Sequence, residues 1–94
     1  MRLQAPIGVD LVRREGEHRS LDVGVRECTP GEFPFARDGY SEVFAVLSGR
    51  ATLHIDGGPS FELVPGATML TPSGTTGRWV VHETTRTTYV TIAD

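Results

Sequence analysis

The sequence predicts an all-β domain, and two features of the chain carry that prediction. No segment repeats its apolar residues at the helical spacing of about 3.6 residues, whereas short runs alternate apolar and polar residues. Glycine and proline interrupt these runs at short intervals, as turns between strands require. Together these features are typical of a β-sandwich or a β-barrel.

The predicted strands follow one another in order, and a turn signal ends each of them. Residues 21–27 form a predicted strand that stops at the break Thr29-Pro30-Gly31. Residues 42–48 form the next one, which Gly49 closes. Both runs are rich in valine and other residues that favour an extended, half-buried backbone.

The second half of the chain continues the same pattern. Residues 51–55 alternate up to Asp56-Gly57-Gly58, a hairpin signal because glycine adopts positive φ readily. Phe61 and Leu63 then share one face before Pro65-Gly66 turns the chain. The remaining strands are expected at residues 67–71, 78–83 and 87–92.

Composition limits what this chain does. Ninety-four residues suffice for one domain with a single core. No apolar stretch approaches the roughly 20 residues that span a bilayer, and the first six residues lack a signal-peptide run, so no membrane partner is expected. The single cysteine, Cys28, forms no internal disulfide, and a cytoplasmic location is predicted.

The charged residues exclude two further classes. The net charge is −3 and the basic residues are scattered, so nucleic acid is not an expected partner. All nine basic residues are arginine, which excludes a Schiff-base lysine within this sequence.

Two motifs resemble those of the cupin superfamily. In residues 42–49 (EVFAVLSG) a glutamate precedes a glycine by seven positions, as at the end of the first cupin motif. Residues 66–74 (GATMLTPSG) resemble the opening of the second motif. The resemblance implies that residues 21–94 form a single cupin-type domain, a double-stranded β-helix or jelly-roll barrel. It leaves residues 1–20 as an N-terminal arm or an edge strand.

A finer resemblance points to one branch of these proteins. Residues 27–33 (ECTPGEF), 38–42 (DGYSE) and 77–89 (GRWVVHETTRTTY) are similar to the branch typified by ureidoglycine aminohydrolase. That branch implies a small polar nitrogenous or carboxylic substrate. Its enzymes are metal-dependent and contain two fused cupin domains, whereas this sequence contains one.

The metal ligands that the cupin resemblance implies are missing, apart from Glu42. Two histidines are expected just before Glu42, where residues 35–38 read Phe-Ala-Arg-Asp, and a third is expected where Gly77 stands. One carboxylate does not hold a first-row metal ion with useful affinity. No cofactor is therefore predicted and the metal site is degenerate. A divalent metal held with help from Asp38 or Cys28 is the disfavoured alternative.

Alternation along the strands predicts which side chains share the barrel interior. The resemblance implies that Glu42 faces inward, and Gly77 would then leave room beside Trp79 where an imidazole usually stands. An acid, an indole and an open volume together predict a small-molecule pocket. The further residues expected to face inward by this alternation are Phe44, Val46, Val81 and Glu83.

Glu42 has a structural and a functional interpretation. In the first, it is a semi-buried carboxylate paired with an arginine such as Arg26, Arg37 or Arg78. In the second, it is a general acid or base, or it anchors a ligand amine.

The other candidate ligand-binding residues are Arg37, Tyr40, Trp79 and Tyr89. The Arg37 guanidinium suits a carboxylate or ureido oxygen, unless it is solvated. The two tyrosines are expected at the barrel mouth, and Trp79 either orients a ligand or packs in the core. Cys28 is expected to be an inert buried thiol.

Two functions therefore compete. In the first, the domain binds a small polar molecule in the barrel and acts as an enzyme of the ureidoglycine aminohydrolase type. In the second, it is a non-catalytic cupin module that senses a metabolite or serves as a dimeric scaffold. A homodimer is predicted under both, because Ile7, Val9 and Leu11 suit a strand that covers an exposed sheet edge of a partner.

Overall fold

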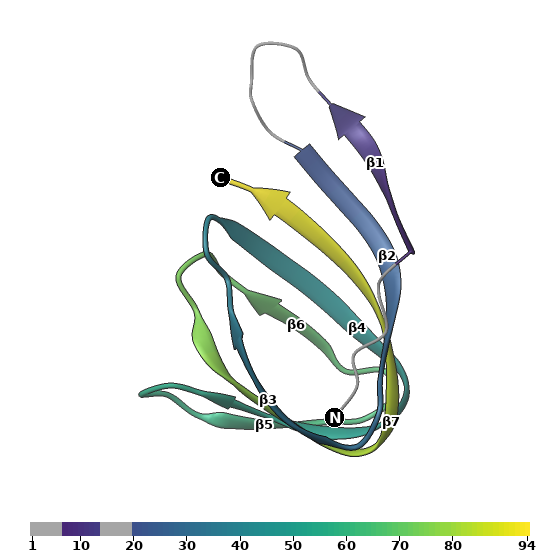
Figure 1. The fold of residues 1–94 in the computed structure, drawn as a ribbon, viewed down its shortest axis with the longest axis vertical. Coiled ribbons are helices and arrows are strands. Elements are labelled where there is room, and N and C mark those ends of the chain that lie inside the picture. The colour runs from purple at the N-terminus through teal and green to yellow at the C-terminus, as the bar shows by residue number, and fades with distance from the viewer. Residues whose placement is uncertain (1–6, 14–19) are drawn as a thin grey trace.

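A computed structural model describes residues 7–13 and 20–94, with the backbone alone described for residues 7–13 and Ser20. The described chain consists of antiparallel strands joined by turns (Figure 1). The strands are β1 (Ile7–Arg13), β2 (Ser20–Cys28), β3 (Gly31–Ala36), β4 (Tyr40–Ile55), β5 (Ser60–Leu63), β6 (Thr68–Thr71) and β7 (Thr76–Ala93). Nowhere in these two ranges does a helix have the length and apolar character needed to cross a bilayer.

Two long strands, β4 and β7, pair along most of their length and bend together, so each belongs to both layers of the barrel. One layer has the order β1-β2-β7-β4-β6, and the other has the order β3-β7-β4-β5. Figure 1 shows the sheet curling over so that the two layers face each other. This arrangement confirms the predicted all-β fold and is that of a jelly-roll barrel.

The bend lies at Gly49, which has a φ of 90°. Here the pairing of β4 with β7 shifts register between Val46 and Ala51, as a β-bulge does. A Cβ at Gly49 would overlap the carbonyl oxygen of Thr84 on β7. Only glycine allows both this conformation and this close approach of two backbones.

The bend also corrects three predictions. Residues 42–48 and 51–55 are parts of one strand, and so are residues 78–83 and 87–92, because the predicted breaks are bends rather than ends. Glu83 does not face inward, since it sits at the bend with its side chain 65% exposed.

Strand β3 was not predicted, because Pro34 stands in its middle. Proline removes one hydrogen-bond donor and is confined to edge strands. Among the described strands, β3 pairs only with β7, so the edge position tolerates Pro34.

The core lies between the two layers. The ring of Phe44 on β4 contacts Trp79 on β7 with 5.1 Å between centroids, and Phe33 on β3 stacks on Trp79 at 6.2 Å. The predicted inward orientation of Phe44, Val46, Trp79 and Val81 is confirmed, since all are buried. The remaining buried apolar residues are Cys28, Ala51, Leu53, Leu63 and Tyr89.

Strand β1 pairs antiparallel with β2, from Ile7 opposite Val25 to Arg13 opposite Ser20, and forms the edge of its layer. Residues 1–6 and 14–19 lie outside the described residues. The alternative that residues 1–20 form an arm across a partner subunit stays a prediction.

Substitution Gly49→Ala tests the bend. It is expected to lower the free energy of unfolding by about 2–5 kcal/mol, because left-handed backbone strain adds to overpacking against Thr84. The matched control is Gly74→Ala, where φ is 92° and nothing lies within 4 Å of the added Cβ. Its loss should be about 1–2 kcal/mol from strain alone. Urea unfolding measures both, and equal losses would contradict the proposed contact.

Candidate functional site

Glu42 is a charged residue with its side chain buried among the inward-facing residues of β4, where 1% of its surface is exposed. Its Cα neighbours across the sheet are Thr71 on β6 and Thr91 on β7. The hydroxyl of Thr71 donates a hydrogen bond of 3.1 Å to the carbonyl oxygen of Glu42. A carboxylate this deep is expensive unless it is paired and hydrogen-bonded.

Arg26 on β2 is the first partner of this carboxylate. Its Nη2 donates to Oε1 of Glu42 at 2.8 Å and its Nη1 donates to Oε2 at 3.3 Å, a bidentate arrangement. The guanidinium carbon lies 4.5 Å from the centre of the Tyr89 ring. Burial works to lower the pKa of Arg26, but the hydrogen bond and charge of Glu42 outweigh it and raise the pKa above its ordinary value.

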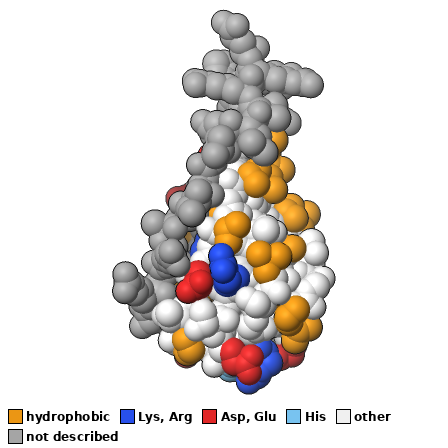
Figure 2. Space-filling view, turned by 90° about the vertical axis from the view of Figure 1, so that its right-hand side faces the viewer, with side chains coloured by type: hydrophobic (Ala, Val, Ile, Leu, Met, Phe, Trp, Pro, Cys, Tyr) orange, Lys and Arg blue, Asp and Glu red, His pale blue; other side chains and the backbone are white. Residues whose placement is uncertain are grey.

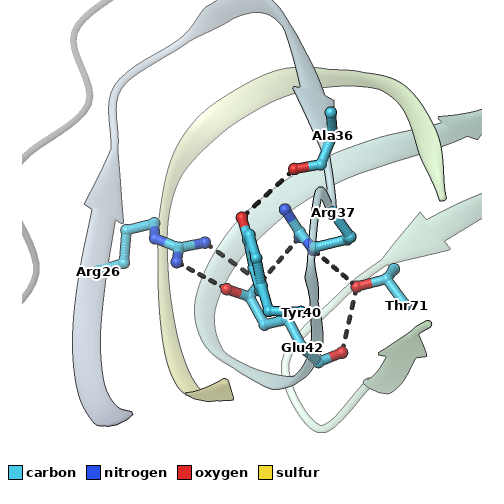
Figure 3. A network of polar contacts seen from close by, with 6 residues as sticks. All are labelled: Arg26, Ala36, Arg37, Tyr40, Glu42 and Thr71. Carbon is cyan, nitrogen blue, oxygen red and sulfur yellow. Dashed lines mark hydrogen bonds and ion pairs between the residues drawn. The ribbon is translucent and has the colours of Figure 1, made fainter. Parts of the chain in front are cut away.

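Arg37, just after β3, is the second partner. Its Nη2 donates to Oε2 of Glu42 at 2.8 Å, and its Nε donates to the hydroxyl of Thr71 at 2.9 Å. The guanidinium carbon lies 4.8 Å from the ring centre of Phe35 and 5.9 Å from that of Tyr40. Figure 3 shows Arg26, on β2, and Arg37, just after β3, both approaching the carboxylate of Glu42.

The backbone holds Arg37 in this position. Its N–H donates to the carbonyl of Thr75, and its own carbonyl accepts from the N–H of Gly74, so the second motif clamps the residue. Arg37 lies in the segment where metal-binding cupins are expected to carry histidine. At this position the Arg37 guanidinium places a positive charge on the Glu42 carboxylate.

A cavity of about 280 Å³ lies beside this cluster, between β2, β3 and the inner face of β7. Arg26, Arg37, Tyr40 and Trp79 are among its lining residues, and Phe33 closes it on the β3 side. Among the described residues, two arginines line this cavity and no acidic residue does.

The predicted site residues are only partly brought together. Arg37, Tyr40 and Trp79 line the 280 Å³ cavity. Tyr89 and Glu42 border a second cavity of about 430 Å³ on the other side of Arg26. Arg26 itself lines both cavities.

Gly77 does not provide the expected open volume beside Trp79. A Cβ at Gly77 would overlap the carbonyl oxygen of His54 and lie 2.9 Å from Cε1 of Phe35. The ring of Phe35 and the backbone of β4 therefore fill the position. Glycine is needed there for close packing.

Sequence reasoning named Arg26 only as one partner for Glu42 and did not place it in the ligand site. In β2 the inward positions are Gly24, Arg26 and Cys28, whereas Val23 and Val25 alternate with them. The usual alternation of apolar inward and polar outward residues would predict that these valines face inward. The signal for Arg26 was its parity with Cys28, which was expected to be buried.

The donors present do not fit a cupin metal centre. Across the part of the chain that the structure describes, no three His, Cys, Asp or Glu side chains come together as metal ligands. Asp38 is exposed and borders a different hollow from the one beside Trp79. Both oxygens of Glu42 are already bound by guanidinium groups.

Cys28, His54 and His82 are the remaining candidates for a nucleophile or a base. Burial raises the pKa of the Cys28 thiol, although the nearby Arg26 charge works against this, so the thiol keeps its proton at neutral pH. His54 contacts Ser60 at 2.6 Å and His82 contacts Thr52 at 2.8 Å, both on the outside of the barrel. Neither histidine is among the residues that line the 280 Å³ cavity.

A small jelly-roll barrel with a buried glutamate at the end of its first motif is a cupin domain. The chain belongs to the EutQ-like cupin domain family, whose model matches residues 15–89. The cupin prediction is thus confirmed, whereas the match does not extend to the ureidoglycine aminohydrolase branch. No curated protein matches the sequence.

Solved structures show the same fold. The EutQ protein of Clostridium difficile is 26% identical with a TM-score of 0.71, over 94% of this chain and 68% of that one. A Rhizobium leguminosarum protein of unknown function is 27% identical with a TM-score of 0.75, over 93% and 78%. Ectoine synthase of P. lautus is 17% identical with a TM-score of 0.69, over 82% and 55%, which is a likeness of fold alone.

Substitution Glu42→Gln tests the buried cluster. It is expected to lower the free energy of unfolding by about 3–5 kcal/mol, because two buried guanidinium groups lose their shared charge. The control is Glu83→Gln, which removes an exposed partner 3.9 Å from Arg50. That change should lower the free energy by less than about 1 kcal/mol. Thermal and urea unfolding measure both, and a small loss in Glu42→Gln would refute the cluster's structural role.

Proposed function

We propose that this protein binds a small polar molecule in the cavity beside the Arg26–Glu42–Arg37 cluster, and that it does so without a metal ion. The observation that carries the proposal is a 280 Å³ cavity with two arginines in its wall. Such a cavity joins apolar walls to a few fixed polar groups, as ligand sites commonly do. The free thiol of Cys28 suits the cytoplasmic setting proposed for it.

Binding is favoured over catalysis because Glu42 is committed to its partners. A general base needs a free lone pair within reach of the substrate proton. Here arginine donors occupy three of the about four acceptor positions of the carboxylate, and the residue does not line the 280 Å³ cavity. Chemistry of the ureidoglycine aminohydrolase type is the alternative, and turnover of ureidoglycine would favour it.

The single tryptophan makes binding measurable, because Trp79 lines the cavity. Protein dialysed against EDTA is titrated with glycine, methylurea, acetamide, acetate and benzoate while Trp79 fluorescence is recorded. At least one probe should give a saturable change that Arg26→Met weakens. Arg78→Gln is the control, because Arg78 is exposed beside Trp79 and pairs with Glu32 at 3.1 Å. No response to any probe, or a stoichiometric bound metal that dialysis fails to remove, would contradict the proposal.

A dimeric scaffold is the second candidate, and the outer face of the larger layer favours it. One aligned row crosses four strands on that face: Leu70, Val43, Val90 and Val23. Val43 points outward because its chain neighbours Glu42 and Phe44 point inward. Leu70, Val90 and Val23 share its face because they are aligned with it across the sheet. Figure 2 shows hydrophobic side chains running down one side of the molecule.

A second copy of this chain is the proposed occupant of that face. Leu70 is 59% exposed and Ile92 is 37% exposed, which is unusual for a monomer when such residues are contiguous. A twofold interface places one patch against itself, so the patch must be self-complementary. An uncharged row of valine and leucine meets that condition, and two such faces pack as sheets do.

Sedimentation velocity at micromolar concentration tests the dimer. The wild-type protein should sediment as a dimer, and Leu70→Arg with Ile92→Arg should be monomeric because charge is desolvated at the interface. Phe61→Arg is the control, since Phe61 lies on β5 in the other layer and is 36% exposed. A monomeric wild type would refute the proposal.

A further inference from the structure

We infer that the ligand of this cavity is a small monocarboxylate with a flat apolar body, held by Arg26 and Arg37 at one end and by Phe33 and Trp79 at the other. The inference rests on the proposed function and specifies its ligand class. Three features of the site carry it: its charge, its hydrogen-bonding groups and its walls.

The three described residues Arg26, Arg37 and Glu42 do not balance one another in charge. Arg26 and Arg37 share one carboxylate, that of Glu42, so two positive charges face one negative charge. Cys28 is protonated at neutral pH and adds none. Asp22 is exposed and borders the 430 Å³ cavity on the other side of Arg26. One monoanion in the 280 Å³ cavity would bring the cluster to neutrality, which a buried site favours.

The charged groups of the cavity wall are hydrogen-bond donors, whereas two of its hydroxyls have already donated their protons and can only accept from a ligand. A carboxylate only accepts hydrogen bonds, whereas a ureido or amide group also brings N–H groups that need acceptors. The hydroxyl of Thr85 already donates to the carbonyl of Glu83 at 2.8 Å, and that of Tyr40 to the carbonyl of Ala36 at 3.3 Å. Guanidinium groups offer only donors. The two guanidinium groups, which are the charged groups in this wall, therefore suit a carboxylate.

The side chains of Arg26 and Arg37 differ in how deeply they are buried and in how firmly they are held. Arg37 is 5% exposed and is bound by Glu42 and Thr71, so its position is fixed. In Figure 3 its second terminal nitrogen carries no bond to the residues drawn. Arg26 is 18% exposed and lies between the two cavities. An incoming carboxylate can take the remaining donor of Arg37 while Arg26 turns toward it.

The walls of the cavity define the rest of the ligand. Phe33, Phe35 and Trp79 supply aromatic surface, with Phe33 and Trp79 nearly parallel at an interplanar angle of 2°. A planar body packs against such rings better than a branched one. The volume of about 280 Å³ is just below the range of about 300–1,000 Å³ for drug-sized ligands, so the ligand is smaller.

Trp79 fluorescence separates these features with four probes. Benzoate has the charge and the ring, benzamide keeps the ring without the charge, acetate keeps the charge without the ring, and sulfate is an inorganic anion. Benzoate should give a saturable change below about 10 mM, at least about 10-fold tighter than benzamide and acetate. Sulfate should bind no better than acetate.

The matched variants assign the carboxylate to its partners. Arg26→Gln and Arg37→Gln should each weaken benzoate binding about 10–100-fold. Arg78→Gln should leave it unchanged. If either cavity variant unfolds, Arg26→Lys keeps the charge but loses the bidentate fork and should still weaken binding. In the wild-type protein the arginine side-chain NMR signals should shift with benzoate and not with benzamide.

The outcomes separate this inference from the proposed function. If benzamide or methylurea binds as tightly as benzoate, the site binds small molecules but the carboxylate inference is wrong. If sulfate or acetate matches benzoate, the flat apolar body is wrong. If benzoate gives no saturable response up to about 10 mM, the inference is refuted even where another probe binds.

Discussion

The buried pairing of Glu42 with two arginines is the constraint on which this barrel depends. Three strands or adjoining segments meet through it, because Arg26 comes from β2, Arg37 follows β3 and Glu42 lies on β4. Breaking such a cluster leaves uncompensated charge in a dry interior, whereas an intact one is roughly neutral in stability. The cluster is therefore retained either to fix one arrangement of the strands or to present charge to a ligand.

The fold explains why charge can be held so deep. The two layers share β4 and β7, and the bend at Gly49 brings the Glu42 half of β4 over Trp79 on the other half of β7. The space left between β2 and β3 is lined by aromatic rings and by two guanidinium groups. A barrel built for a metal ion needs imidazole donors at that place. Here arginine supplies the positive charge and changes what the interior can attract.

The sequence predicts the barrel well and its interior less well. The spacing from Glu42 to Gly49 indicates the motif, because the strand that carries the glutamate has to bend at a glycine seven residues later. Alternation along the strand predicts the wrong orientation for Glu83, which is exposed at the bend. In β2 alternation is ambiguous, because Val23 and Val25 face outward while Gly24 and Arg26 face inward. An apolar outer face removes the contrast on which alternation depends. The clamp on Arg37 joins residues far apart in sequence, so no local pattern reveals it.

We propose that guanidinium groups, rather than a metal ion, balance the charge of Glu42. Crystals grown in excess manganese and zinc, with anomalous data collected at both absorption edges, test it most directly. Arg26 and Arg37 should stay on the Glu42 oxygens, and no anomalous peak should lie within coordination distance of them. A metal ion bound to Glu42, with Arg37 displaced, would contradict it.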